Sequence, residues 1–190
     1  MLARRATAVG RDDGELFAEV ARGNLGALGA LFDRHHEAVR SVAIHAGVPW
    51  HEADDAVQDT FLKLAAMAPR YDGRPDARPW ILATAWRVAA DRRRSLGRWL
   101  RALARLAHQA PAARLLTPED ERAAAERWEA FAARVAALPE KMGAAFVLVE
   151  VQGLSGEEAA RALGIPVATV WTRLHHARKR MQESAGGGEP

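Results

Sequence analysis

The C-terminal part of the chain carries polar and basic side chains at spacings that suit DNA recognition. Arg173 can donate a pair of hydrogen bonds to one guanine, whereas a threonine can contact a thymine methyl group or a phosphate. Arg178 and Lys179 suit backbone phosphates, which fix position without reading sequence. The candidate DNA-binding residues of this segment are Thr169, Trp171, Thr172, Arg173, His176, Arg178 and Lys179.

Two short helices and a sharp turn are needed to position these side chains. Ser155 and Glu158 stand at capping-box spacing, which predicts a helix beginning at about Ser155. Gly164 can adopt a positive φ and Pro166 can begin a helix but not continue one, so the chain is expected to turn there. The next helix places four apolar residues at core spacing: Val170, Leu174, Ala177 and Met181. This pattern predicts a helix-turn-helix whose last helix enters a major groove, the alternative being a basic solvated face on an ordinary three-helix domain.

Composition limits the class of protein. The 190 residues include 27 Lys and Arg against 24 Asp and Glu, and they include no cysteine, so disulfides, thiolate metal sites and thiol redox sensing are excluded. The N-terminus lacks the apolar segment of a signal peptide and no run approaches membrane-spanning length, which predicts a cytoplasmic location.

Helical patterns follow one another along the chain, and no segment reads as a strand. We therefore predict an all-α fold of two small helical domains joined by a flexible linker, with the helix-turn-helix in the second. The expected bounds are 10–95 for the first domain, 96–117 for the linker, 118–183 for the second domain and 184–190 for a disordered tail.

The predicted helix from Glu52 to Met67 has an acidic outward side. Once its apolar stripe is buried, the exposed positions are Asp54, Asp55, Gln58, Asp59 and Leu62. An exposed leucine among carboxylates suggests a contact surface for a partner protein, the alternative being a solvated acidic face with one stray leucine. A metal site around His51 is disfavoured because no ligand pattern occurs and consecutive helical residues point apart.

The segment from Arg70 to Arg94 mixes aromatic and basic residues. Tyr71, Trp80 and Trp86 alternate with arginines, which is the mixture that stacks an unpaired base while neutralising its backbone. The arginines are Arg70, Arg74, Arg78, Arg87, Arg92, Arg93 and Arg94. The alternative is that the tryptophans are core residues, as indoles usually are, and for Trp80 the two roles are compatible.

Three blocks in this order resemble a bacterial extracytoplasmic-function sigma factor of the sigma-70 family. EADDAVQDTFLKLA resembles the core-binding helix of that family, PWILATAWRVAADRRR resembles its promoter-melting and minus-10 helices, and LPEKMGAAFVLVEVQGLSGEEAARALGIPVATVWTRLHHARKRM resembles its minus-35-reading domain. The resemblance implies that Asp55, Gln58 and Asp59 bind the clamp helices of the polymerase largest subunit, with Asp54 and Leu62 beside them. Trp80, Ala85 and Asp91 also fall on the family pattern. Together with the aromatic and basic residues described above, the predicted minus-10 set is Arg70, Tyr71, Arg74, Arg78, Trp80, Arg87, Asp91 and Arg94.

Two positions depart from the family pattern, and both bear on promoter preference. Arg87 stands where the family commonly has asparagine, and Trp171 where it commonly has lysine. We expect Trp171 to contact thymine methyl groups rather than to pack, because Val170 and Leu174 already fill the core stripe.

The resemblance implies a transcription factor that is not an enzyme. Its partners would be core RNA polymerase, promoter DNA and an anti-sigma factor, with no cofactor, no metal and no membrane insertion. No nucleophile with a positioned base and no phosphate-cradling loop is present in the sequence. The competing interpretation is a stand-alone helix-turn-helix repressor or activator that dimerises on a palindrome, and the acidic helix argues against it.

Overall fold

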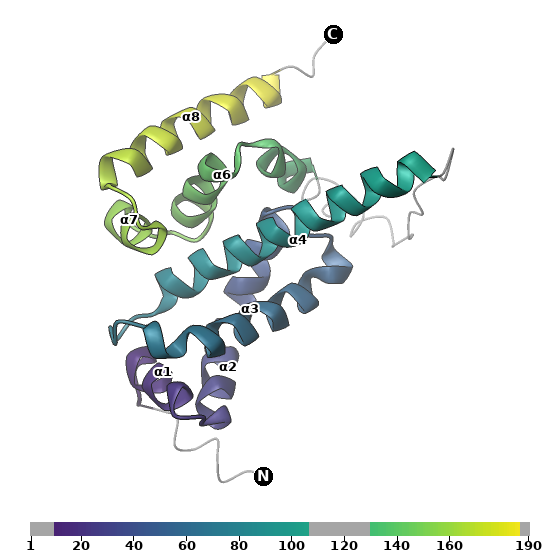
Figure 1. The fold of residues 1–190 in the computed structure, drawn as a ribbon. Helices are drawn as coiled ribbons and strands as arrows, with labels where there is room; N and C mark the ends of the chain where they lie inside the picture. The colour runs from purple at the N-terminus through teal and green to yellow at the C-terminus, as the bar shows by residue number, and fades with distance from the viewer. Residues whose placement is uncertain (1–9, 107–129, 187–190) are drawn as a thin grey trace, which may run out of the picture.

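The computed structural model describes residues 10–106 and 130–186, and every regular element within these ranges is helical (Figure 1). The first group comprises α1 (Asp13–Ala21), α2 (Leu25–His45), α3 (Ala53–Met67) and α4 (Arg78–Leu106), with short 3-10 turns η2 (Trp50–Glu52) and η3 (Ala68–Arg70). The second group comprises a helix over 130–137, α6 (Glu140–Phe146), the π-helical turn η4 (Val147–Val151), α7 (Gly156–Leu163) and α8 (Val167–Gly186). The predicted all-α fold with a C-terminal helix-turn-helix is confirmed.

The helix-turn-helix begins and turns where the local sequence requires. The Ser155 hydroxyl accepts from the Glu158 amide at 3.2 Å, and the Glu158 carboxylate accepts from the Ser155 amide at 2.8 Å. These hydrogen bonds lower the pKa of Glu158, because they favour its charged form. Gly164 ends α7 with φ of 69°, a left-handed conformation that glycine adopts without strain. Both the capping box and the glycine turn were predicted.

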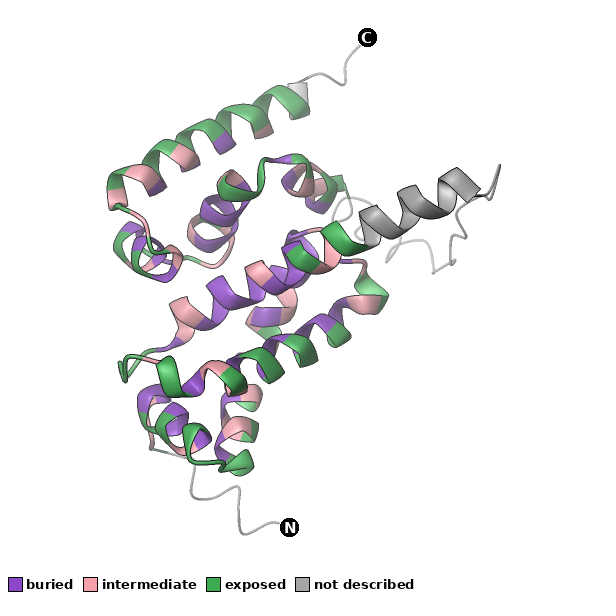
Figure 2. Ribbon diagram, in the orientation of Figure 1, coloured by how far each residue is buried: buried purple, intermediate pink, exposed green. Residues whose placement is uncertain are grey.

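Each group of helices buries its own apolar stripe (Figure 2). In the first, α1 covers one end of a bundle formed by α2, α3 and α4. Its fully buried side chains include Leu16, Phe17, Leu31, Val39, Leu64, Ile81 and Leu82. In the second, α6 packs against α8, and the buried side chains include Val135, Leu148, Val170, Leu174 and Ala177. The predicted core stripe of the recognition helix is therefore correct at these last three positions, and Met181 is partly buried beside them.

Helix α4 is longer than the sequence pattern indicated. The pattern of residues predicts a helix from Trp80 to Arg94, whereas α4 begins at Arg78 and continues past Arg94 to Leu106. The added stretch is rich in Arg, Leu and Ala, which are strong helix formers, so Gly97 alone does not end the helix. The expected linker thus begins as helix, and its part from residue 107 lies outside the described residues. The expected start of the second domain at 118 and the last residues of the tail, from 187, also lie outside them.

The two groups of helices pack against each other through α4. This helix contacts α2 and α3 on one side and α7, α6 and η4 on the other (Figure 1). The indole of Trp86 lies at the centre of this contact, where a Cβ at Gly143 would come within 2.8 Å of its Cη2 atom. The two domains are therefore docked, and α4 belongs both to the core of the first domain and to its contact with the second.

Candidate polymerase and nucleic-acid interfaces

The outward side of α3 is acidic and exposed. Its inner side buries Ala53, Val57, Phe61 and Leu64. On the same side, the Thr60 hydroxyl donates a hydrogen bond to the Ala56 carbonyl at 2.7 Å. The opposite side exposes every predicted polymerase-binding residue, namely Asp54, Asp55, Gln58, Asp59 and Leu62. Leu62 is 67% exposed, which is high for a large apolar residue on a folded helix. The pattern-derived division of this helix into a core side and an outward side therefore matches the structure.

Arginines from neighbouring helices partly neutralise these carboxylates. Arg92 of α4 reaches over α3, where it pairs with Asp59 and lies 3.8 Å from Asp55 and 3.9 Å from Glu52. Arg40 of α2 pairs with Asp54, with 2.9 Å between Nε and Oδ1. More than one carboxylate shares Arg92, so the face keeps a negative excess that a basic partner can meet.

The loop between η3 and α4 is anchored by aromatic packing. The rings of Tyr71 and Trp80 have centroids 5.0 Å apart, and Phe17 of α1 lies 4.9 Å from Tyr71 and 5.2 Å from Trp80. The Tyr71 hydroxyl donates to the Arg74 carbonyl at 2.9 Å. Burial and the nearby carboxylates raise the pKa of Tyr71, which keeps the phenol protonated as a donor. Trp80 and Tyr71 are thus half-buried, with one side in the core and the other toward the loop.

Asp13 fastens the same loop to α1 and α2. It is buried, its amide donates to the Pro75 carbonyl at 2.9 Å, and its carboxylate accepts from the Ala77 amide at 3.2 Å and from His35 Nε2 at 2.9 Å. Burial by itself would raise the pKa of Asp13, but hydrogen bonds and charge from His35, with Arg34 and Ala77, outweigh it and lower that pKa. The carboxylate is therefore ionised and holds the loop in place.

A cavity of about 560 Å³ opens beside this loop. Residues from both domains line it: Arg70, Tyr71, Asp72, Arg74, Pro75, Asp76, Pro79 and Trp80 from the first, and Glu158, Arg161 and Ala162 from the second. Its size lies within the range of small-ligand pockets. Its lining combines aromatic rings and arginines, which suit a planar base with a phosphate, with three carboxylates, one of which pairs with Arg74. The docked second domain forms one wall of this cavity.

Several arginines predicted to contact minus-10 DNA face the second domain instead. The Arg78 guanidinium donates to the Gln152 carbonyl at 2.9 Å, and that of Arg87 donates to the Ala162 carbonyl at 2.9 Å. Arg94 pairs with Glu140 and with Asp91, another predicted site residue. Arg70 and Arg74 remain exposed on the loop. The docked arrangement therefore occupies Arg78, Arg87 and Arg94 with protein partners.

The recognition helix α8 presents its predicted side chains away from the core. Trp171, Thr172, His176, Arg178 and Lys179 are exposed, and Thr169 and Arg173 are half-buried. The Thr172 hydroxyl donates to the Ala168 carbonyl at 3.0 Å, and Arg178 pairs with Glu150, with 3.1 Å between Nε and the carboxylate. Arg173 forms no ion pair among the described residues, which leaves its guanidinium available.

Trp171 packs against α7 with one part of its ring while the rest stays exposed to solvent. Its indole lies against Gly156 in the first turn of α7, where a Cβ would come within 2.5 Å of the ring, and 48% of the residue stays exposed. The packing that the sequence left as the alternative thus occurs, and it fixes the orientation of the ring. The exposed part of the residue leaves the predicted DNA contact open.

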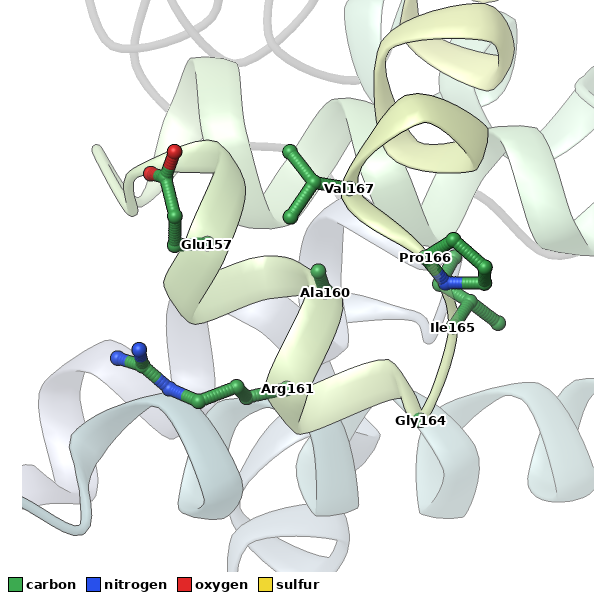
Figure 3. Close-up of a pocket in the computed structure, with 7 residues that line it drawn as sticks. All are labelled: Glu157, Ala160, Arg161, Gly164, Ile165, Pro166 and Val167. Carbon is green, nitrogen blue, oxygen red and sulfur yellow. The ribbon is translucent and has the colours of Figure 1, made fainter.

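The corner of the helix-turn-helix borders an open cavity of about 620 Å³. Figure 3 shows its lining around the end of α7 and the first turn of α8: Glu157, Ala160, Arg161, Gly164, Ile165, Pro166 and Val167. Glu157 and Arg161 extend from α7, and the rest of the lining is apolar or glycine. The corner is thus a shallow apolar hollow.

Comparison with known proteins decides the family. A family model described as Sigma-70 region 2 matches residues 31–107, and one described as Sigma-70, region 4 matches residues 128–181. The chain is 32% identical over 183 residues to the ECF RNA polymerase sigma factor SigC of Mycobacterium tuberculosis, covering 94% of this chain and 96% of that protein. The chain belongs to the sigma-70 family.

Further relatives place it among the extracytoplasmic-function sigma factors. It is 31% identical over 178 residues to the ECF RNA polymerase sigma factor SigM of Mycobacterium tuberculosis, covering 93% of this chain and 86% of that protein. The solved structure of CnrH in complex with the cytosolic domain of CnrY matches with a TM-score of 0.67 and 26% identity, covering 93% of this chain and 99% of that one. This sigma factor is thus a promoter-directing transcription initiation factor, not an enzyme. Among its described helices, none is long and apolar enough to cross a membrane.

Residues that sequence reasoning missed lie where distant segments meet in this sigma factor. Arg93 bridges the two domains, donating to the carbonyls of Ala46 at 3.0 Å and Ala136 at 2.9 Å. Asp13 anchors the loop of the first domain, and Trp50 stands exposed beside the acidic helix. Only Trp50 had a local signal, since it is a tryptophan directly before that helix. The partners of Arg93 are main-chain carbonyls, which every residue has, so the residue types in the sequence cannot predict this contact.

Proposed function

We propose that this sigma factor divides its work among three surfaces. The acidic side of α3 binds core RNA polymerase, the loop before α4 holds an unpaired base of the minus-10 element, and α8 reads the minus-35 element in the major groove. The observation that supports this division is the difference in exposure: Asp55 and Asp59 are open in the docked chain, whereas Arg78 and Arg87 are engaged with the second domain.

That difference implies an order of events. Core polymerase can bind α3 while the domains are docked, but promoter DNA needs the α4 arginines and the base cavity, which α7 walls on one side. The domains must therefore separate before the minus-10 element is bound. DNA phosphates can replace the carbonyls of Gln152 and Ala162, because a guanidinium binds phosphate more strongly than a neutral carbonyl.

Promoter opening follows from the chemistry of the base cavity. A base can stack on Tyr71 or Trp80 only after leaving the duplex, so binding energy at this site favours the melted strand. Arg70 and Arg74 lie exposed on the same loop and suit the backbone of that strand. Because both Tyr71 and Trp80 also pack on Phe17, a test of base capture at either residue needs a melting-temperature measurement beside it.

The second domain supplies sequence recognition in double-stranded DNA. In this proposal Arg173 reads a base edge, Thr169, Thr172 and His176 lie beside it, Trp171 touches thymine methyl groups, and Arg178 and Lys179 contact phosphates. The Arg178–Glu150 pair has to open or shift for that contact.

An anti-sigma factor and a cytoplasmic site of action complete the proposal. The solved CnrH structure contains a cytosolic domain of CnrY, and a protein that holds the domains of this chain together would keep Arg78 and Arg87 from DNA in the same way as the docked state does. Without cysteine, release cannot depend on thiol oxidation of this chain. We infer a cytoplasmic site of action because the proposed partners, core polymerase and promoter DNA, are found there.

The test of the proposal is a core-binding titration with Asp59→Arg. The charge reversal is expected to weaken binding to core polymerase at least tenfold while helicity is retained, because it places a cation where a basic partner is expected. Arg92→Ala is the matched control, since it removes the same internal ion pair and leaves the carboxylate in place. Unchanged core affinity for Asp59→Arg, or an equal loss for Arg92→Ala, would remove this surface from the proposal.

A further inference from the structure

Trp50 is exposed in a way that tryptophan seldom is. It lies in the turn η2 immediately before α3, and 68% of it is open to solvent. The guanidinium carbon of Arg40 stands 3.9 Å from the centroid of its ring, at cation–π distance. Tryptophan is among the residues enriched at protein–protein interfaces relative to the rest of the surface.

One face of the indole is covered by a side chain from a neighbouring helix. Arg40 comes from α2 and is itself fixed by Asp54 of α3, with 2.9 Å between Nε and Oδ1. The turn is closed by the Glu52 amide, which donates to the Pro49 carbonyl at 2.9 Å. A side chain already fixed in the free protein loses little rotamer freedom when a partner binds it, so its apolar area contributes fully to affinity.

Trp50 continues the outward side of α3. It lies in the 3-10 turn η2, four residues before Asp54, and the exposed Gln58 and Leu62 follow Asp54 at the same interval along α3. These four positions are referred to below as the row. Leu62 is 67% exposed at the far end of the row. The row therefore has an apolar residue at each end and polar residues between them, an arrangement typical of a protein contact with apolar anchors.

We propose that Trp50 is an apolar anchor for core RNA polymerase, extending the acidic α3 surface by one turn toward the N-terminus. The inference rests on the proposed role of α3. The polymerase surface that fits is basic where it faces Asp55 and Asp59 and offers an apolar hollow opposite the indole. Arg40 stabilises the pose of Trp50 and neutralises Asp54, so the anchor lies at the less acidic end of the row.

The experiment is a titration of the full-length chain with purified core RNA polymerase. Trp50→Ala is expected to lower the affinity about ten- to hundredfold, the range for a buried tryptophan anchor, with the melting temperature unchanged because the side chain is exposed. Trp50→Phe is expected to recover part of the loss. Leu25→Ala is the matched control, since Leu25 is 78% exposed at the start of α2, outside the row, and its removal is expected to leave core affinity unchanged.

Asp59→Arg, measured in the same titration, separates the two ways in which the idea can fail. Weak binding of Asp59→Arg together with full affinity of Trp50→Ala would overturn the anchor and leave the α3 surface in place. Full affinity of both would overturn the proposed role of α3 itself. Full affinity of Trp50→Ala for core polymerase combined with lost affinity for an anti-sigma factor would also overturn the anchor, since the indole would then serve that other partner.

Discussion

Gly143→Ala is expected to separate the two domains. A Cβ at this position would lie 2.8 Å from Cη2 and 3.0 Å from Cζ2 of Trp86, closer than atoms in contact can pack. Trp86 is only 2% exposed, so its ring is enclosed by neighbouring atoms. Inside its own helix the change is favourable by about 1 kcal/mol, because alanine loses less conformational entropy than glycine. The cost therefore falls on the contact between the domains.

The size of the effect follows from the packing. Inserting a methyl group into a close-packed contact costs about 1–3 kcal/mol, which shifts the ratio of docked to separated chains by about five- to 150-fold. Opposing this shift are the hydrogen bonds of Arg78, Arg87 and Arg93 to second-domain carbonyls, each contributing up to about 1.5–3 kcal/mol when well shielded and less at these partly exposed sites. Together these bonds can exceed the cost of one methyl group, so the substitution is expected to raise the separated fraction rather than to separate every molecule.

Small-angle X-ray scattering and tryptophan emission measure this fraction. Separation increases the radius of gyration and moves the Trp86 indole into water, which shifts its emission to longer wavelength. Gly29→Ala is the matched control, because it makes the same change in a helix with nothing within 4 Å of the new Cβ. An unchanged radius of gyration in Gly143→Ala, with normal helicity, would refute the reasoning.

Three other outcomes are expected. Because the pKa of Asp13 is lowered by folding, its ionised form stabilises the chain above the ordinary value of 3.8, and that stability is lost as pH falls through the lower folded value. Urea unfolding at several pH values should show this loss, and Asp13→Asn should reduce it to the part contributed by other carboxylates such as Glu158. Arg173→Ala should lower the binding free energy by about 1–3 kcal/mol at one promoter position, whereas Arg178→Ala should weaken binding to all DNA sequences alike and reduce its salt dependence. Binding measured across single-base promoter variants distinguishes the two. A uniform loss for both substitutions would make Arg173 a phosphate contact. Gly156→Ala should displace the Trp171 ring and destabilise the second domain by about 1–3 kcal/mol in thermal melts, since the new Cβ lies 2.5 Å from the ring; an unchanged melt would show that the ring moves freely.

The features that the sequence predicted are local ones. The capping box of Ser155 and Glu158 and the left-handed Gly164 depend on neighbours a few residues away, so residue type and spacing are sufficient. The outward side of α3 followed from helical periodicity alone. The end of α4 did not, because its continuation depends on the summed propensity of a basic, alanine- and leucine-rich stretch rather than on one stop signal.

The docking of the domains could not be predicted for a different reason. Arg87 looks the same in the sequence whether it meets a phosphate or the Ala162 carbonyl, which lies 75 residues away. The same holds for Asp13, whose partners include His35 and the Ala77 amide. The DNA-binding roles assigned to the α4 arginines remain predictions.

The π-helical turn η4 has a consequence for how this chain tolerates insertions and deletions. Its five residues, Val147–Val151, accommodate one residue more than a regular α-helical turn, and the Gln152 amide accordingly bonds the Val147 carbonyl at 2.9 Å. Gly143, which faces the first domain, lies before this turn, and the DNA-reading helices lie after it. Removing one residue would restore an α-helix and rotate one surface relative to the other by about 100°. The length of this turn therefore sets the angle between the two surfaces. Deleting one residue from it would change how α8 is oriented relative to the first domain without replacing any contact residue.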